Sequence, residues 1–150
     1  MTYTRTFGGT GTEDGKFHCC HGIWLDPRGK EPLLGATDRE SRRIPYFTLD
    51  GKFVKTNTDG IRRPCYFDTR ADMMLVADLN SVVQLFDKDN KLIGSLGDGA
   101  AVPDLRGHPR KDFIPGRFIH PHGAKFLHNG HILVVEWIPI GRLTLLKKVS

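Results

Sequence analysis

Short runs of strand-forming residues recur along this chain in units of about forty residues, and this repetition constrains the fold more than any other feature. Val, Ile, Phe, Leu and Tyr fill the runs, and Gly, Pro, Asp and Asn bound them, as is typical of β-strands. The runs lie at 22–26, 32–38, 43–49 and 53–57 in the first unit, 65–68, 73–78, 82–87 and 91–96 in the second, and 123–127, 131–136 and 142–147 in the third. Units of this length with four strands each are typical of propeller blades.

A fourth strand for the third unit is found at the start of the chain. Tyr3–Phe7 followed by Gly8-Gly9 resembles Lys91–Leu96 followed by Gly97-Asp98, which is the end of the second unit. The chain therefore holds enough strands for three blades, and it begins and ends out of phase with them. Propellers close their rings in this way.

We predict an all-β fold, a β-propeller with three four-stranded blades per chain, in one half-propeller domain over residues 1–150. The blades are expected at about 22–57, 64–97 and 122–148. Propellers have about four to eight blades, so three blades do not close a ring. We expect a homodimer with six blades, in which residues 3–7 of each chain complete a blade of the other and leave no open sheet edge.

The segment 98–117 is an insertion between the second and third units. It contains Pro103, Pro109 and Pro115 among several basic residues, which favours a loop. We expect this loop to cross one face of the ring. Two roles are open for it, either a lid over a substrate or a passive surface loop.

The composition argues against several classes of protein. The net charge is +5, but the basic residues are dispersed, so we expect no nucleic-acid partner, whereas a cleft for a small anionic or ester substrate is compatible. No apolar run is long enough to cross a bilayer, which predicts no membrane partner. The three cysteines do not follow a disulfide pattern, and the first residues do not resemble a secretory leader. These features indicate the cytoplasm.

Two histidines and a cysteine stand at equivalent points of the three units, at His21, Cys65 and His122. Blades arranged around an axis would bring these side chains together, and a homodimer would place four histidines there. A catalytic zinc site needs about three N, O or S ligands and an open position for water. We predict a divalent transition metal, preferably zinc, although imidazole also suits copper, nickel and iron. The alternatives are histidines bonded to backbone and a Cys65 that is only a small buried apolar residue.

Other residues hold repeated positions near these three. His18 and His120 are equivalent, and they either orient the ligands or lie exposed in loops. Trp137 lies near a blade end, where it lines a substrate pocket or only packs. A further set shares a position at the end of the second strand of each unit, and it comprises Asp38, Asp78 and Glu136. We expect these carboxylates to hydrogen-bond the adjacent loop.

The run Arg5–Phe17 resembles the segment between blades in the NHL-repeat family of six-bladed β-propellers. Cys20-His21-Gly22 and Pro121-His122-Gly123 are similar to the segments that open blades in the peptidyl-α-hydroxyglycine α-amidating lyases of that family, whose histidines there bind metal. The resemblance covers nearly the whole chain but only half of a family propeller. It implies metal-binding roles for His21 and His122.

Ala36-Thr37-Asp38-Arg39-Glu40 resembles another lyase segment, in which the arginine is catalytic. The resemblance therefore implies a catalytic Arg39. Two lyase features have no counterpart here, namely a third zinc-binding histidine and a tyrosine after a second strand. Arg39, Leu79-Asn80 and Trp137 stand at the places where that tyrosine would be expected.

These observations favour a metal-dependent hydrolase acting on an ester or phosphoester. A bound metal would lower the pKa of water to about 7, and Arg39 would bind an anionic substrate. Arg39 could instead form an ion pair with Asp38 or Glu40. Two other functions are open, an amidating-lyase-like zinc lyase and a non-catalytic NHL propeller that binds protein or peptide. The sequence leaves enzyme activity itself undecided.

Overall fold

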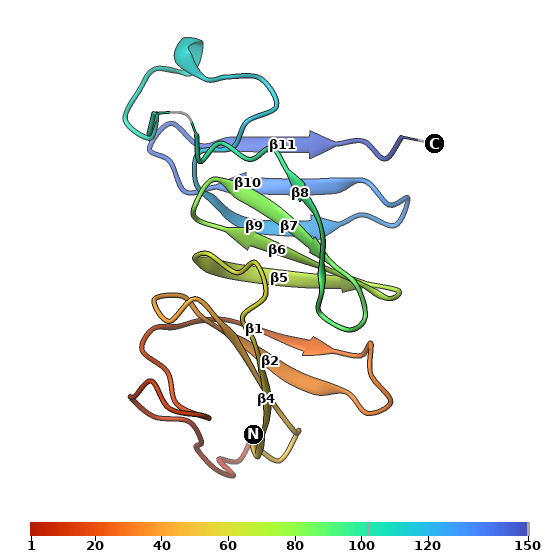
Figure 1. Ribbon diagram of the computed structural model, residues 1–150. Coiled ribbons are helices and arrows are strands. Elements are labelled where there is room, and N and C mark those ends of the chain that lie inside the picture. Colours follow the sequence, from red (N-terminus) through yellow and green to blue (C-terminus); the bar gives the residue numbers. More distant parts are fainter. Residues whose placement is uncertain (102, 150) are drawn as a thin grey trace.

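The computed structural model describes residues 1–101 and 103–149, and it contains three antiparallel sheets that follow one another in chain order (Figure 1). The first sheet consists of β1 (Cys20–Asp26), β2 (Leu33–Asp38), β3 (Ile44–Phe47) and β4 (Phe53–Asn57). The second consists of β5 (Pro64–Arg70), β6 (Met73–Asp78), β7 (Val82–Phe86) and β8 (Leu92–Leu96). The third consists of β9 (Pro121–Phe126), β10 (Ile132–Glu136) and β11 (Arg142–Leu146). Within each sheet every strand pairs with its neighbour in sequence.

The prediction of an all-β fold is confirmed, and every expected run from 22 to 147 corresponds to a strand. The described residues contain one helical element, the 3-10 turn η1 (Arg110–Asp112), which lies in the insertion 98–117. Over that same part of the chain, no helix is long and apolar enough to cross a membrane.

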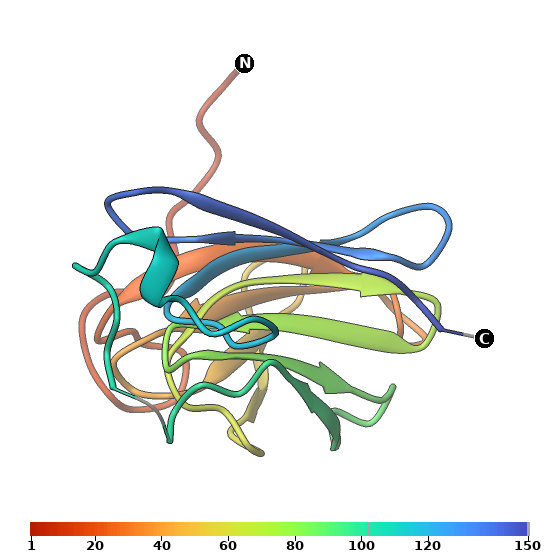
Figure 2. The same cartoon turned by 90° about the horizontal axis from the view of Figure 1, so that it is seen from above.

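The segment Tyr3–Phe7 forms no strand in this chain. The first residues extend away from the sheets (Figure 2), whereas Phe7 packs against Phe47 of β3 with ring centroids 5.4 Å apart. The guanidinium of Arg5 donates to the carbonyl of Asp50 at 2.7 Å. The segment is therefore attached to the first sheet only at its end, and its pairing with a second copy stays a prediction.

Consecutive sheets pack face to face, and their first strands are neighbours. β1 contacts β5, and β9 contacts both β5 and β6. The interface between the first and second sheets, called here the first interface, buries Ile44, Tyr46, Ile61, Phe67, Met74, Val76 and Phe86. The interface between the second and third sheets, called the second interface, buries Leu75, Ala77, Val83, Phe118, Ala124, Ile132 and Val134. Each interface has its own apolar core, so the three sheets form one continuous stack.

Candidate metal centre

His21, Cys65 and His122 come together at the point where the three first strands begin. One potential ligand atom from each residue lies within 4.8 Å of the other two, and the two imidazole rings have centroids 4.9 Å apart. The three residues belong to three different sheets. The prediction that repeated positions bring these side chains together is therefore confirmed, and a single chain is sufficient to do so.

Each of the three residues lies at an irregularity in the pairing of its strand. Regular pairing is interrupted between Cys20 and Ile23 in β1, between Pro64 and Tyr66 in β5, and after Pro121 in β9. The skipped positions include His21, Cys65 and His122. An extra residue in one strand bends that strand locally and changes the direction of its side chain. The same irregularity in all three sheets therefore turns the ligand residues toward a common point.

Gly22 and Thr37 hold the first two of these strands close together. A Cβ atom added to Gly22 would lie 2.3 Å from the carbonyl oxygen of Cys65, so no residue with a side chain fits there without a shift. The buried Thr37 hydroxyl accepts from the Gly22 amide and donates to the Cys65 carbonyl, both at 2.7 Å. These contacts fix the position of Cys65 relative to His21.

Three carboxylates fix the loops that lead into the ligands, as expected from their repeated position. Each accepts hydrogen bonds from two successive backbone amides: Asp38 from His18 and Cys19, Asp78 from Arg62 and Arg63, and Glu136 from Ile119 and His120. Asp38 also pairs with Arg43 and Glu136 with Arg142. Asp78 has no ion pair among the described residues, and burial raises its pKa above the ordinary value. The carboxylate at the end of each second strand thus holds the backbone that leads into the ligand at the start of the neighbouring first strand.

The electrostatic environment keeps both histidines ready to bind a metal. Burial lowers the pKa of His21, and the positive charge of Arg39 lowers it further. The pKa of His122 is also lowered, by burial first and then by the electrostatic effects of His21 and Arg39. Both imidazoles are therefore neutral at pH 7, which is the form that coordinates metal. Burial raises the pKa of the Cys65 thiol to about 11, so a metal would have to displace its proton.

One buried atom of the site lacks a protein partner. Nδ1 of His21 is buried and makes no hydrogen bond among the described residues. Buried polar atoms are rarely left without a partner, and a metal ion is one partner that an imidazole nitrogen accepts. The donor set of two imidazoles and one thiol is also one that zinc uses. The residues present therefore fit a transition metal.

Arg39 follows β2 directly and lies beside the three ligand residues. Its positive charge acts on His21, Cys65 and His122. Its Nε donates to Glu40 at 3.1 Å, and Glu40 also accepts from Arg63 at 2.8 Å. The expected ion pair with Glu40 is present, and it does not remove Arg39 from the site. Glu40 thus holds two arginines at the edge of the ligand group.

The other predicted site residues lie outside the ligand group. His18 is exposed, and its backbone amide bonds Asp38. Nδ1 of His120 donates to the Leu79 carbonyl (2.8 Å), and its Nε2 lies 3.3 Å from the carboxylate of Asp104 in the insertion. The ring of Trp137 is exposed and is covered by the guanidinium of Arg106 at 4.0 Å from the centroid. His120 and Trp137 therefore attach the insertion to the third sheet.

Tyr66 is a site residue that the sequence analysis missed. Its ring centroid lies 5.5 Å from that of His21 and 5.8 Å from that of His122. Its position next to Cys65 in β5 was visible in the sequence, but the pairing irregularity that places it beside both histidines was not. Tyr66 gives the group an aromatic wall with a hydroxyl.

Comparison with known proteins assigns no family to this chain. No protein-family model matches it, and neither does any curated protein. Among solved structures, the crystal structure of the computationally designed Ika4 protein matches 85% of this chain and 89% of that chain, with 10% sequence identity and a TM-score of 0.47. A likeness at this level establishes neither a shared fold nor a shared function. The resemblance to NHL propellers stays a prediction from sequence.

Proposed function

We propose that this chain is a metal-dependent hydrolase of small anionic esters or phosphoesters, with a zinc ion held by His21, Cys65 and His122. The observation that carries the proposal is the meeting of three ligand side chains from three sheets within 4.8 Å of one another. Three protein ligands leave a position of tetrahedral zinc open for water. Zinc-bound water has a pKa near 7, which supplies hydroxide at neutral pH.

Arg39 and its neighbours give this site its preference for anions. The guanidinium of Arg39 lies beside the ligands, where it would bind a substrate carboxylate or phosphate and stabilise developing negative charge. Glu40 orients Arg39 and Arg63 through one carboxylate. Cys19, Cys20 and Cys65 are free thiols, which fits the cytoplasm as the place of action.

Cobalt substitution tests the ligand set directly. We expect the purified protein to bind one Co²⁺ per chain and to show a thiolate-to-cobalt charge-transfer band. Cys65→Ser should remove that band, and His122→Ala should remove binding. His128→Ala is the control, because His128 lies in the loop after β9 and outside the ligand group.

Activity is then measured with chromogenic phosphate and carboxylate esters. We expect zinc-dependent turnover that His122→Ala abolishes and that Arg39→Ala reduces by about a hundredfold, the usual effect of losing one electrostatic stabiliser. Metal binding without turnover of any ester would reject the hydrolase and leave a structural ion in a binding module. If His122→Ala retained both the metal and the activity, the site would be rejected.

We further propose that two chains close a six-bladed propeller, each supplying half of the ring. The support is a difference in burial between equivalent residues. Leu133 and Val135 of β10 are 37% and 44% exposed, whereas their counterparts Leu75 and Ala77 in β6 are fully buried at the second interface. The face of the third sheet that points away from the second sheet therefore exposes apolar side chains that a neighbouring sheet would bury.

The opposite end of the stack has the complementary face. Ile23 of β1 is 62% exposed, whereas its counterparts Phe67 and Ala124 are 4% and 8% exposed. A second copy would place its first sheet on the third sheet of this chain and repeat the packing already present twice within the chain. Two-fold symmetry would cover both open faces at once.

The assembly is tested by measuring mass in solution. We expect twice the chain mass of 16.9 kDa and a monomer for Leu143→Asp, which places a charge on the open face of the third sheet. Leu49→Asp is the matched control, because Leu49 is similarly exposed but lies in the β3–β4 turn. A monomeric wild-type protein would reject the ring.

A second candidate function is a zinc lyase that resembles the amidating lyases. The position of Tyr66 favours it, because a phenol beside both histidines supplies the group that the sequence pattern lacks. A lyase would cleave a peptidyl-α-hydroxyglycine and lose its activity in Tyr66→Phe. A hydrolase of esters would keep most of its turnover in that variant.

A further inference from the structure

A pocket of about 780 Å³ opens at the second interface, on the side of the sheets away from the strand starts that hold the metal ligands. Its walls come from all four strands of the second sheet and from all three strands of the third. The apolar lining consists of Met73, Leu85, Leu96, Phe126, Ile132, Leu145, Leu146 and Val149. Its size falls within the range of about 300–1,000 Å³ usual for small-molecule sites.

The corresponding space at the first interface is filled. Strand pairing makes Leu85 the counterpart of Tyr46, and Leu146 the counterpart of Phe86. Tyr46 and Phe86 are both fully buried. Smaller side chains at the second interface therefore leave room that the larger ones occupy at the first.

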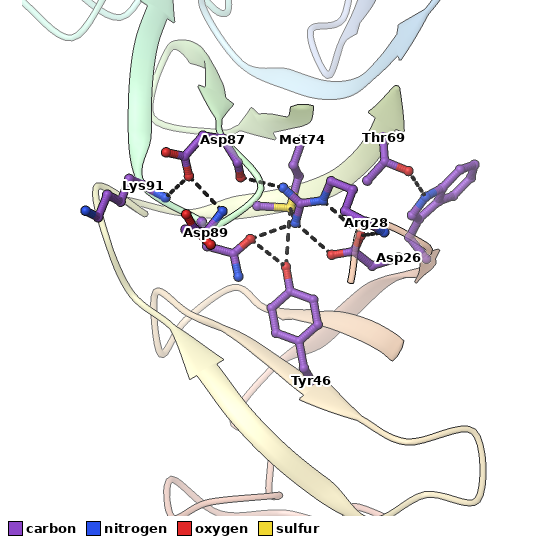
Figure 3. A network of polar contacts seen from close by, with 10 residues as sticks. Asp26, Arg28, Tyr46, Thr69, Met74, Asp87, Asp89 and Lys91 are labelled. Atoms are coloured by element: carbon purple, nitrogen blue, oxygen red, sulfur yellow. Dashed lines mark hydrogen bonds and ion pairs between the residues drawn. The ribbon is translucent and has the colours of Figure 1, made fainter. Parts of the chain in front are cut away.

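A loop adds to this difference. The β1–β2 loop, residues 27–32, inserts Arg28 between the first and second sheets, where it meets Tyr46, Met74 and the turn at Asp87 (Figure 3). The β5–β6 connection consists only of Ala71 and Asp72, which is too short to insert a side chain in the same way. The opening at the second interface is therefore a consequence of two sequence features, and not a local packing fault.

The charged residues that line the pocket are all cationic, namely Arg70, Lys147 and Lys148. Two of them approach Gly130, where an added Cβ would lie 3.2 Å from Cδ of Lys148 and 3.5 Å from Nη1 of Arg70, whose Nη2 donates to the His128 carbonyl at 3.2 Å. Neither forms an ion pair within the described residues, and no carboxylate lines the pocket. Two cations without a counterion favour an anionic ligand at this end.

We infer that the pocket binds an alkyl carboxylate, such as a fatty acid, with its chain between the two sheets and its carboxylate at Arg70 and Lys148. An alkyl chain fits the lining better than a peptide does, because the walls offer no uncharged polar side chain to a peptide backbone. A buried peptide group without hydrogen bonds costs several kcal/mol. This site does not depend on the proposed hydrolase, and its test is separate from the tests of metal binding and of activity.

Dodecanoate titration by calorimetry tests this site with wild-type protein. We expect saturable binding of one molecule per chain. Leu85→Trp should weaken it by narrowing the pocket, and the double variant Arg70→Ala with Lys148→Ala should weaken it by about tenfold or more, as expected for lost hydrogen bonds to charged groups. Lys52→Ala removes a well-exposed cation elsewhere and should leave binding unchanged.

Equal affinity for dodecanoate and for dodecyltrimethylammonium would overturn the inference, because it would show that the cations play no part. Undiminished binding in both Leu85→Trp and the double variant, with folding of each verified by circular dichroism, would overturn it as well. His122→Ala separates the two sites, because it should lose metal and keep dodecanoate. An acidic peptide that competes with dodecanoate at equal affinity would contradict the alkyl assignment.

Discussion

The two sheet interfaces share one strand plan but differ in what fills them. At the first, Arg28 is buried and donates to Asp26 (2.7 Å), to Asn90 (2.6 Å) and to the carbonyl of Asp87 (2.7 Å), beside the ring of Tyr46 (Figure 3). At the second, Lys125 reaches Asp68 from solvent, and an apolar pocket stays open. The first interface is therefore specified by a network around a buried arginine, whereas the second has an apolar core and a buried carboxylate, Asp68, which accepts from Lys125 and from the Phe126 amide.

The comparison shows that the repeat sets where strands pair, whereas loops set how the sheets pack. Counterpart strands in the three sheets have the same neighbours. The length of the connection after each first strand decides whether a charged side chain enters the interface. A repeated fold can thus combine a rigid interface and an adaptable one without any change in strand order.

The largest expected effect is at Arg28. Its side chain is 2% exposed and that of Asp26 is 8% exposed, so Arg28→Ala leaves a buried carboxylate without its partner. We expect the free energy of unfolding to fall by about 3–5 kcal/mol, measured by urea denaturation. Arg70→Ala, at the end of β5, makes no ion pair among the described residues and should cost about 0.5 kcal/mol or less. Equal losses would contradict the difference between the interfaces.

Metal binding should reduce the difference in stability between the two interfaces, because the ligand residues come from all three sheets and so bridge both interfaces. Zinc at about 100 times its Kd is expected to raise the free energy of unfolding by about 2.7 kcal/mol. Hydrogen exchange should slow in both β5 and β9. His122→Ala should lose the stabilisation, whereas His128→Ala should keep it. Protection confined to one interface would mean that the metal does not join the three sheets.

Acid should weaken the first interface through Asp26. Burial acts to raise the pKa of this carboxyl, but hydrogen bonds and charge from Arg28 outweigh burial and hold it below the ordinary value of 3.8. The stabilisation is therefore present above pH 3.8 and is lost as the pH falls through the lower, folded-state pKa. Urea denaturation from pH 6 to pH 2 should show this loss. The double variant Asp26→Asn with Arg28→Met should show a shallower acid limb, and an unchanged limb would contradict the assignment.

The smallest effect is expected for a substitution that gives the second interface the residue found at the equivalent position of the first. Leu85→Tyr copies Tyr46 into the open pocket and should raise the free energy of unfolding by about 1 kcal/mol or less, as is usual when a cavity is filled. Thermal denaturation measures the change. A large loss of stability would mean that the pocket walls do not accept the ring.

Much of the fold was predictable because strand runs and turn residues recur at fixed spacing. The spacing also identified His21, Cys65 and His122, since equivalent positions in stacked sheets come together. His18 and His120 share the repeat as well, and their role was left open between orienting the ligands and lying in loops; they lie on the preceding loop, where Asp38 and Glu136 bind their backbone amides. A repeat defines position along a strand, and the pairing irregularity decides which neighbour turns inward.

Features that depend on contact between sheets were not predictable. Thr37 looked like an ordinary strand residue, and only the approach of β1 to β5 makes its hydroxyl a link to Cys65. The pocket at the second interface depends on the reach of the β1–β2 loop relative to the β5–β6 turn. Tyr3–Phe7 was predicted as a strand, but in this chain it lies beside the first sheet, whereas the open edge is that of β11 in the third sheet.

The irregular pairing at each ligand has a consequence for how this centre could change. Because each ligand is the residue skipped by the strand ladder, its side chain takes part in neither interface core. The chemical nature of the donors is therefore set separately from the architecture. Exchange of Cys65 for histidine would convert a mixed sulfur and nitrogen centre into one with three imidazoles, the set that carbonic anhydrase uses. A metal held by that set would have a different reactivity, and the fully buried position of Cys65 would have to accommodate the larger imidazole.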